Sequence, residues 1–478
     1  MIAEPGPRVQ AIRARIDHPV IDCDGHTIEF MPMVREELKK LGGQSLVDGM
    51  DTVFNANALT RGLGVDTKRA LGLFRLSWWA FPTRNTLDRA SAMLPKLQYE
   101  RLDELGIDFA VLYPTLGLAT TVIDEPELRC GMARAFNRFY AEGFGEFSDR
   151  LTHVAIIPMH TPEEAIEELE YAVGTLGMKA AVLSGFAFRP VEGEDIPRVA
   201  RWLDTFGLDS PHDYDPVWAK CVELGISPTF HSSAMGWYRG SSMRNYMYNH
   251  IGNFAVAGET MCRSLFFDGV PKRFPELNFS FLEGGVGWGC NLYSDLIGHY
   301  EKRGGGRIDE YDPKHLDHAL MRDLFQRFGS QAAQKYMDEL PASLSLLSDP
   351  DEDRSQIDEF ARSGVECAED IRDIFVNQFY FGCEADDPIN AMAFDTRMNP
   401  LGASQNALFS SDIGHWDVPD TREVLGEAFE LVDDELLSEA DFRRFVYENP
   451  RRFHTRANPR FFHGTVIEEG EAAQNQAE

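Results

Sequence analysis

Short apolar runs recur along the chain and alternate with longer amphipathic segments. Eight runs have the length and composition of buried strands, at residues 20–23, 109–113, 152–157, 179–183, 227–230, 278–282, 378–381 and 407–410. Several segments between them carry helix-start signals, of which Thr161-Pro-Glu-Glu164 is the clearest, with an N-cap Thr, Pro at the first helical position and Glu at the third. Parallel strands need crossovers of about a dozen or more residues, and these spacings supply them. The pattern therefore predicts an α/β fold, a (β/α)₈ TIM barrel rather than an antiparallel sandwich.

Three stretches interrupt this repeat and are much longer than ordinary βα loops, at about 30–100, 184–212 and 301–372. We interpret them as caps or interface elements, and the third as a mixed helical and acidic insertion exposed to solvent. In the first, Trp78 and Trp79 would either line a pocket or simply pack. The predicted organisation is an N-terminal arm (1–17), the barrel with its insertions (18–435), a helical C-terminal extension (436–466) and a polar tail (467–478).

Composition narrows the class of protein. The chain has 478 residues, of which 43% are hydrophobic, so it can bury a large core, and its length suits one barrel with decorations. Its net charge of −31 repels phosphate backbones and anionic lipids, which argues against nucleic acid and membranes as partners. The N-terminus lacks the apolar stretch of a signal peptide, and the seven cysteines form no CxxC pair. We therefore expect a cytoplasmic protein with reduced thiols.

The end of the first predicted strand carries polar side chains at alternating positions. The stretch Asp22-Cys-Asp24-Gly-His26 follows two apolar residues, and Glu29 comes shortly after it. Because side chains alternate along a strand, Asp22, Asp24 and His26 share one face, which in a closed barrel is the lumen. Such a group of carboxylates and an imidazole indicates a metal site, with Asp22 and Glu29 as additional ligands or supports.

Polar residues also follow later strands, where the carboxyl ends of barrel strands form the active-site rim. They are His231 after the fifth strand, Glu283 after the sixth, Glu384 after the seventh, and Asp412, followed by His415 and Asp417, after the eighth. Of these, Glu384 is a candidate for an additional ligand or a supporting residue. A lone histidine such as His231 is more often structural than a ligand, and Asp412 would also suit an N-cap of the last helix. Glu283 directly follows an apolar run, where an unpaired carboxylate is costly to bury, so a metal or another cation is its natural partner.

With these motifs the sequence resembles the amidohydrolase-related family, in the branch of metal-dependent hydrolases and nonoxidative decarboxylases. The stretches that carry the resemblance are Asp22–His26, Leu102–Asp108, His231, Phe281–Gly285 and Ser411–His415. The resemblance implies that Asp24 and His26 match the first-strand metal pair, His231 the fifth-strand ligand, and Asp412 the eighth-strand aspartate.

Two positions depart from the family pattern. Asp24-Gly-His26 stands where many members have H-x-H, and Glu283 stands where hydrolases and decarboxylases commonly have a histidine. The second change removes the imidazole that usually polarises a carbonyl or moves a proton. The resulting ligand set, Asp24, His26, His231, Glu283 and Asp412, is harder than a histidine-rich zinc site and suits two ions such as Fe and Mn.

This ligand set resembles that of the dinuclear iron or iron/manganese oxygenases found on the same fold. Our leading hypothesis from sequence is therefore an oxygenase that uses dioxygen to hydroxylate a C–H bond of a small organic substrate. The alternative is a Zn or Mn hydrolase or nonoxidative decarboxylase of a small carboxylated substrate, in which His415 or Asp412 moves the proton. A third hypothesis is a non-catalytic barrel that stabilises a related subunit, since long insertions suit a homo- or hetero-oligomer.

Overall fold

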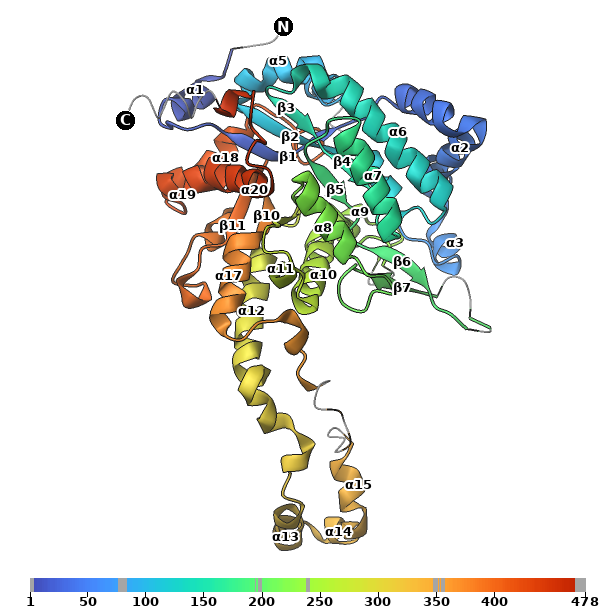
Figure 1. Cartoon of the computed structure of the whole chain (residues 1–478), viewed down its shortest axis with the longest axis vertical. Coiled ribbons are helices and arrows are strands. Elements are labelled where there is room, and N and C mark those ends of the chain that lie inside the picture. Colours follow the sequence, from blue (N-terminus) through green and yellow to red (C-terminus); the bar gives the residue numbers. More distant parts are fainter. Residues whose placement is uncertain are drawn as a thin grey trace.

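The strands of the barrel lie in the upper body of the molecule (Figure 1). The computed structural model describes residues 4–75, 84–193, 195–196, 200–237, 241–346, 351, 353 and 357–468. The barrel strands are β1 (Ile21–Thr27), β2 (Phe109–Pro114), β3 (Leu151–His153), β4 (Ala155–Ile157), β5 (Ala181–Leu183), β8 (Pro228–Phe230), β9 (Phe279–Phe281), β10 (Phe379–Glu384) and β11 (Asn406–Ser410). Each predicted strand corresponds to one of these, with β3 and β4 together forming the third.

The strands close into a parallel barrel. Their order is β1-β2-β3 and then β4-β5-β8-β9-β10-β11, and β3 and β4 are separated only by Val154, whose N–H donates to Leu112 O. At the other seam the His26 N–H donates to Ile413 O and the Asp412 N–H donates to Asp24 O, both at 2.9 Å. First and last strand are therefore joined, and the predicted (β/α)₈ barrel is confirmed.

Amphipathic helices connect the strands and cover the outside of the barrel. The clearest predicted helix start is confirmed, because the Thr161 side chain accepts from the Glu164 N–H at 3.3 Å. The main connecting helices are α5 (Pro95–Leu105), α6 (Pro126–Phe144), α7 (Pro162–Gly174), α8 (Asp215–Leu224), α10 (Asn253–Asp268), α12 (Gly287–Arg303), α17 (Ala368–Gln378) and α18 (Val424–Asp433). Within the part of the chain that the structure describes, none of the helices is both long and apolar enough to cross a bilayer.

The three long stretches have different structures. The first holds the helices α2 (Met31–Arg61), α3 (Val65–Ala70) and α4 (Thr86–Ser91), while Trp78 and Trp79 lie outside the described residues. The second forms an antiparallel hairpin of β6 (Ala187–Pro190) and β7 (Arg201–Asp204). The third continues from α12 into an arm that extends away from the barrel (Figure 1) and carries α13 (His318–Phe328), α14 (Gln331–Gln334) and α15 (Leu340–Leu344).

The last helices cover the amino-terminal ends of the barrel strands. They are α19 (Glu439–Arg443), a π-helical turn η9 (Arg444–Glu448) and α20 (Asn449–Ala457). The Asn449 amide donates to Ala407 O at 2.9 Å, and Phe453 O accepts from the Asn278 amide at 2.9 Å and from Ser227 Oγ at 3.0 Å. This end of the barrel is therefore covered, and the opposite, carboxyl end forms the mouth.

Buried histidine in the barrel wall gives a pH-dependent stability. The His153 ring is stacked on Tyr140 with centroids 3.5 Å apart, and burial lowers its pKa from 6.5 to about 3. Between pH 6.5 and pH 3 the unfolded chain binds a proton at His153 that the folded chain does not bind. The contribution of His153 to the free energy of unfolding is therefore fully present above pH 6.5 and is lost as the pH falls toward 3.

We expect His153→Phe to make the fold less sensitive to acid. From pH 6.5 to pH 5 the wild type should lose about 2 kcal/mol more unfolding free energy than this variant, at about 1.4 kcal/mol per pH unit. Urea unfolding at both pH values measures the difference. His318→Phe, at an exposed histidine of the arm, should behave as the wild type. If the wild type and His153→Phe lose the same unfolding free energy between pH 6.5 and pH 5, His153 is not the cause of the acid sensitivity.

Candidate metal centre at the barrel mouth

Five ligand-type side chains from four strand ends meet at the mouth. Asp24 and His26 lie on β1, His231 follows β8, Glu283 follows β9 and Asp412 follows β11. All five side chains are between 0% and 3% exposed. Residues far apart in sequence are thus brought together because parallel barrel strands end at one rim.

The ligand atoms approach one another closely. His26 Nε2 lies 3.5 Å from Asp24 Oδ1 and 3.3 Å from Asp412 Oδ1. His231 Nε2 lies 3.6 Å from Asp24 Oδ2 and 2.8 Å from Glu283 Oε2. These four nitrogen–oxygen contacts are close, but none of them has the geometry of a hydrogen bond.

Several buried atoms of this cluster have no hydrogen-bond partner among the described residues. They are Asp24 Oδ1, His26 Nε2, His231 Nε2 and both carboxylate oxygens of Glu283 and of Asp412. Burying such groups without compensation costs several kcal/mol each, roughly. A divalent cation bound among them removes this cost, so the residues present fit a metal ion.

Neighbouring groups orient the ligands. Pro114 O lies 3.1 Å from His26 Nδ1, which directs Nε2 of that ring toward the carboxylates. His415 is stacked on His26 with ring centroids 3.8 Å apart, and its Nδ1 lies 2.7 Å from Asp412 Oδ1 while its Nε2 lies 3.1 Å from Thr115 Oγ1. Such outer contacts fix ring orientation and tune metal ligands.

Backbone strain is concentrated at two of the ligand positions. Glu283 and Asp412 have φ values of 55° and 47°, in the left-handed region that residues with a side chain rarely adopt. Each strained residue of this kind costs on the order of 1–3 kcal/mol and persists only where its surroundings enforce it. At Gly25, a Cβ would lie 2.8 Å from Asp22 Oδ2, so a larger residue there would displace the buried Asp22 side chain.

In the absence of a cation, the buried carboxyl and imidazole groups of the cluster favour their uncharged forms. Burial raises the pKa of Asp24, Glu283 and Asp412 well above the usual range, and like charges such as Asp417 beside Glu283 add to the effect. Burial also lowers the pKa of His26 and of His415 well below the usual value. A bound divalent ion reverses the first tendency, because it favours the ionised form of the carboxylates that bind it, and it reinforces the second, because it binds neutral imidazoles.

The structure places Asp22 and Glu29 in supporting positions. Asp22 accepts from the Ser411 N–H at 2.9 Å and the Ser411 hydroxyl at 2.5 Å, and burial raises its pKa to about 6. Glu29 accepts from Tyr140 OH at 2.6 Å and from the backbone N–H groups of residues 115, 116 and 117. Their oxygens hold the loops after β11 and β2, and neither residue belongs to a ligand group that the described residues form.

A second group of carboxylates adjoins the first. Oxygens of Glu384, Asp412 and Asp417 lie within 4.8 Å of one another. The same limit groups Asp24 with His26 and His231, and Asp412 with His26, Glu283 and His415, so Asp412 belongs both to this last group and to the carboxylate group. Asp417 follows Asp412 by five residues, a spacing that by itself predicts no role in the site. His315 and His318, in contrast, lie exposed in the arm.

A cavity of about 340 Å³ opens beside Glu283 at the mouth. His250, Phe254 and Trp416 form an aromatic wall, with the rings of His250 and Trp416 5.5 Å apart. The cavity is also acidic, since its lining includes Glu283, Glu384, Asp386, Asp387, Asp417 and Glu427 but neither Lys nor Arg. Its volume suits a molecule with one aromatic ring, and an anion would need a bound cation to enter.

Comparison with known proteins gives a family and a fold. The model of the Amidohydrolase family matches residues 21–329. The gamma-resorcylate decarboxylase of Rhodococcus jostii (strain RHA1) is 31% identical over 143 residues, which are 29% of this chain and 40% of that protein. The matched stretch thus spans less than half of that relative.

Two solved structures have a similar fold over most of their length. The dihydroxybenzoic acid decarboxylase from Polaromonas sp. JS666, with bound manganese and the inhibitor 2-nitroresorcinol, matches with a TM-score of 0.50 and 15% identity over 93% of this chain and 99% of its own. The 2,6-dihydroxybenzoate decarboxylase from Rhizobium matches with a TM-score of 0.47 and 16% identity over 92% and 99%. At these identities the likeness concerns the fold alone.

Proposed function

This chain belongs to the amidohydrolase family and is a metal-dependent enzyme of that superfamily. We propose that it is a nonoxidative decarboxylase, which removes the carboxyl group of a small aromatic acid without an oxidant. The observation that carries the proposal is a buried ligand cluster next to a one-ring cavity with an aromatic wall, which the cluster adjoins through Glu283. The partial match to gamma-resorcylate decarboxylase supports the same reaction. The comparisons thus support the decarboxylase better than the oxygenase that the carboxylate-rich ligand set predicted, and they name manganese rather than iron.

Four residues would hold the metal ion in this proposal, namely Asp24, His26, His231 and Asp412. Their buried ligand atoms include several without a hydrogen bond among the residues described. When bound, a divalent ion supplies positive charge that attracts a substrate carboxylate and stabilises developing negative charge. His415 contacts Asp412 and Thr115, and so keeps the Asp412 carboxylate turned toward the cluster.

The proton in this reaction would come from Glu283. It occupies the position where family members commonly have a histidine, and it lines the cavity beside the ligand cluster. The bond between the ring carbon and the carboxylate breaks with its electron pair kept by the ring carbon, and CO₂ leaves. Glu283 gives its carboxyl proton to that carbon and is protonated again from solvent. His250, Phe254 and Trp416 would hold the ring against the cavity wall.

A specific observation favours a second candidate, the dinuclear oxygenase. Asp412 belongs to two ligand groups, so a second ion held by Glu384, Asp412 and Asp417 would share a carboxylate with the first. Such a pair of hard, oxygen-rich sites suits Fe or Mn. A second cation would also offset the negative charge of the cavity. The number of ions per chain and the need for dioxygen therefore separate the two candidates.

We expect the manganese-loaded protein to release CO₂ from a hydroxylated benzoate under argon. We would test a panel of hydroxylated benzoates, beginning with 2,6-dihydroxybenzoate, in argon and in air. The assay detects the released CO₂ and identifies the ring product by chromatography. Rates should agree in both, and metal-free protein should be inactive because its acidic cavity repels the substrate anion. Turnover only in air, with oxygen consumed and about two metal ions per chain, would replace this proposal by the oxygenase.

A further inference from the structure

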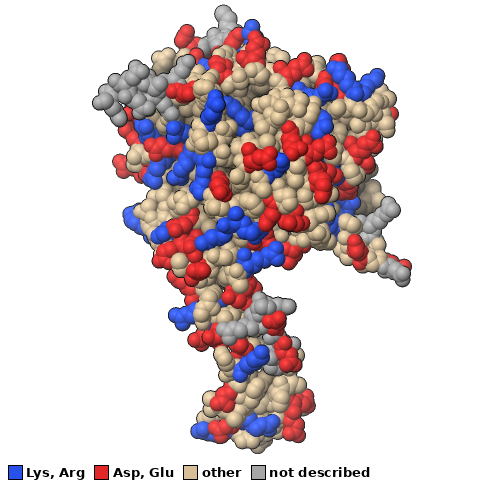
Figure 2. Space-filling view, in the orientation of Figure 1, with Lys and Arg blue, Asp and Glu red and all other residues tan. Residues whose placement is uncertain are grey.

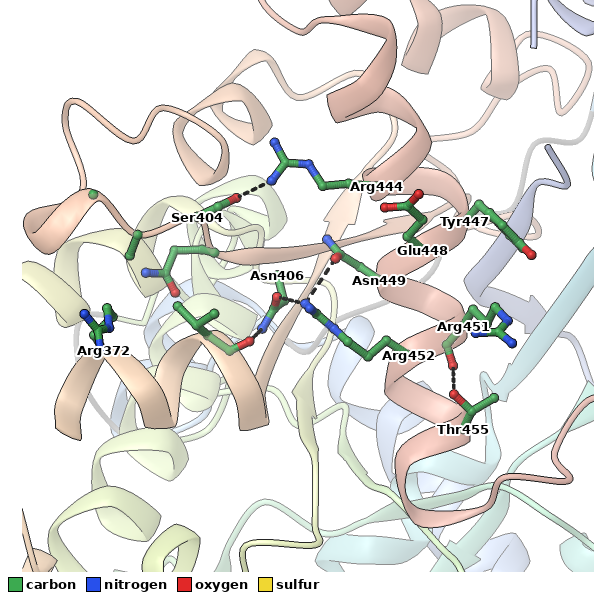
Figure 3. Close-up of a pocket in the computed structure, with 14 residues that line it drawn as sticks. Arg372, Ser404, Asn406, Arg444, Tyr447, Glu448, Asn449, Arg451, Arg452 and Thr455 are labelled. Atoms are coloured by element: carbon green, nitrogen blue, oxygen red, sulfur yellow. Dashed lines mark hydrogen bonds between the residues drawn. The ribbon is translucent and has the colours of Figure 1, made fainter. Parts of the chain in front are cut away.

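A second cavity lies at the end of the barrel opposite the metal centre, and we propose that it binds a small organic polyanion with phosphate or carboxylate groups (Figure 3). It has a volume of about 780 Å³, within the usual range of ligand sites. Its walls come from α17, from residues 402–406 before and at the start of β11, and from η9 and α20. This site is independent of the proposed decarboxylation.

The lining of this cavity is basic in a strongly acidic chain. Four arginines line it, Arg372, Arg444, Arg451 and Arg452, against a single carboxylate, Glu448. Glu448 accepts from Arg443 Nε at 2.9 Å, whereas Arg372 pairs with Asp373 at 2.8 Å and Arg444 pairs with Asp441, two carboxylates outside the lining. Figure 2 shows Lys and Arg side chains gathered over the C-terminal helices of a molecule whose net charge is −31. Local positive potential of this kind selects anions.

Arg452 is held in place by neutral groups alone. Its guanidinium donates to Tyr380 OH at 2.9 Å, to Asn449 Oδ1 at 3.3 Å and to Asn406 Oδ1, and it lies over the Tyr380 ring. Within the ranges that the structure describes, no carboxylate pairs with it. Neutral acceptors orient a guanidinium but do not balance its charge, and Arg452 Nη1 has no hydrogen bond to a described residue. Arg452 is thus a preorganised donor for an anion.

Other polar groups line the same cavity. Arg444 donates to Ser404 Oγ at 3.2 Å and pairs with Asp441. Gln405 is only 1% exposed, and neither atom of its amide has a hydrogen-bond partner in the described part of the chain. An unsatisfied buried amide in the wall of a basic cavity is a donor available to a ligand after a small movement.

The positions of the arginines indicate more than one anionic group in the ligand. Arg372, Arg444 and Arg452 reach the cavity from three different elements and directions (Figure 3). One small anion would contact only part of this set, whereas a molecule with two or more separated charged groups reaches several arginines. Asn406 and Tyr380 lie near the amino-terminal ends of β11 and β10, whereas the ligand group of the mouth uses the opposite ends. The cavity is therefore a separate site.

Isothermal titration of the full chain with two probes tests this proposal, fructose 1,6-bisphosphate for phosphate groups and tricarballylate for carboxylates. At low ionic strength we expect at least one of them to bind with one molecule per chain and a Kd below about 1 mM, weakening as salt is raised. Arg452→Gln and Arg444→Gln should each weaken binding about 10-fold or more, since a charge-assisted hydrogen bond is lost. The probe that binds identifies the anionic group.

Arg327→Gln, in the arm, is the matched control and should bind the probe as the wild type does. If Arg452→Gln does not fold, Arg452→Lys keeps the charge but loses the planar fork, and should also bind more weakly. Absence of binding by both probes, or binding that Arg452 and Arg444 substitutions leave unchanged, would overturn the proposal. The cavity would then be only a space between the C-terminal helices and the barrel.

Discussion

Replacing His26 by alanine should remove most of the bound metal and abolish turnover. The substitution removes an imidazole whose Nε2 lies within 3.5 Å of two carboxylates at the centre of the cluster. Loss of groups that merely orient ligands costs about 10–100-fold in metal affinity or activity, so loss of a ligand should cost at least 100-fold, roughly. Asp24→Ala should have the same effect. Elemental analysis after dialysis, beside the CO₂ assay, measures both.

His318→Ala provides the control for a histidine removed elsewhere, because His318 is exposed in the arm. A second measurement separates metal loss from misfolding. Burial disfavours the Asp24 carboxylate in metal-free protein, so Asp24→Ala without metal should melt no lower than metal-free wild type. Wild-type metal content in both His26→Ala and Asp24→Ala would remove these residues from the ligand set.

Glu283→Gln should retain the metal yet slow turnover by about 10²- to 10⁴-fold, the usual contribution of a general acid. Glutamine keeps the shape of the side chain but has no acidic proton to give to the ring carbon. Glu283→His should recover part of the activity, since family members commonly place an imidazole there. The measurements are metal content and the rate of CO₂ release for both variants.

Glu283→Gln and Glu283→His also test whether Glu283 is a metal ligand, as the sequence suggested. If Glu283→Gln loses metal as fully as His26→Ala does, Glu283 is a ligand rather than the proton donor. A shift of metal preference toward Zn in Glu283→His would have the same meaning, because an imidazole is softer than a carboxylate. Unchanged activity in Glu283→Gln would leave the residue with a structural role only.

The barrel was predictable because each strand is a short apolar run and each crossover is long enough for a helix. The meeting of Asp24, His26 and His231 followed from the same geometry, since a barrel brings the carboxyl ends of its strands to one rim. Asp24 and His26, two positions apart on β1, do meet in one ligand group, whereas a register irregularity between Asp22 and Gly25 interrupts the alternation that was expected to place Asp22 beside them.

The remaining features depend on loop conformations that periodicity does not encode. Asp417 reaches the cluster through the turn after β11, where Asp412 has a positive φ. Glu29 is held by N–H groups after β2 and by Tyr140 from α6, which no spacing along the chain indicates. The basic cavity likewise arises where α17 and the C-terminal helices meet the barrel, so it is a product of tertiary packing.

The seam between β1 and β11 also determines when the metal site can form. The backbone hydrogen bonds that join Asp412 to Asp24 and His26 to Ile413 connect residues almost 390 positions apart in the chain. Contacts of such sequence separation form late, because their loop-closure entropy must be overcome first. During synthesis the first-strand ligands emerge long before their eighth-strand partner. A nascent chain therefore carries only part of the ligand set, and complete metal coordination marks a finished barrel.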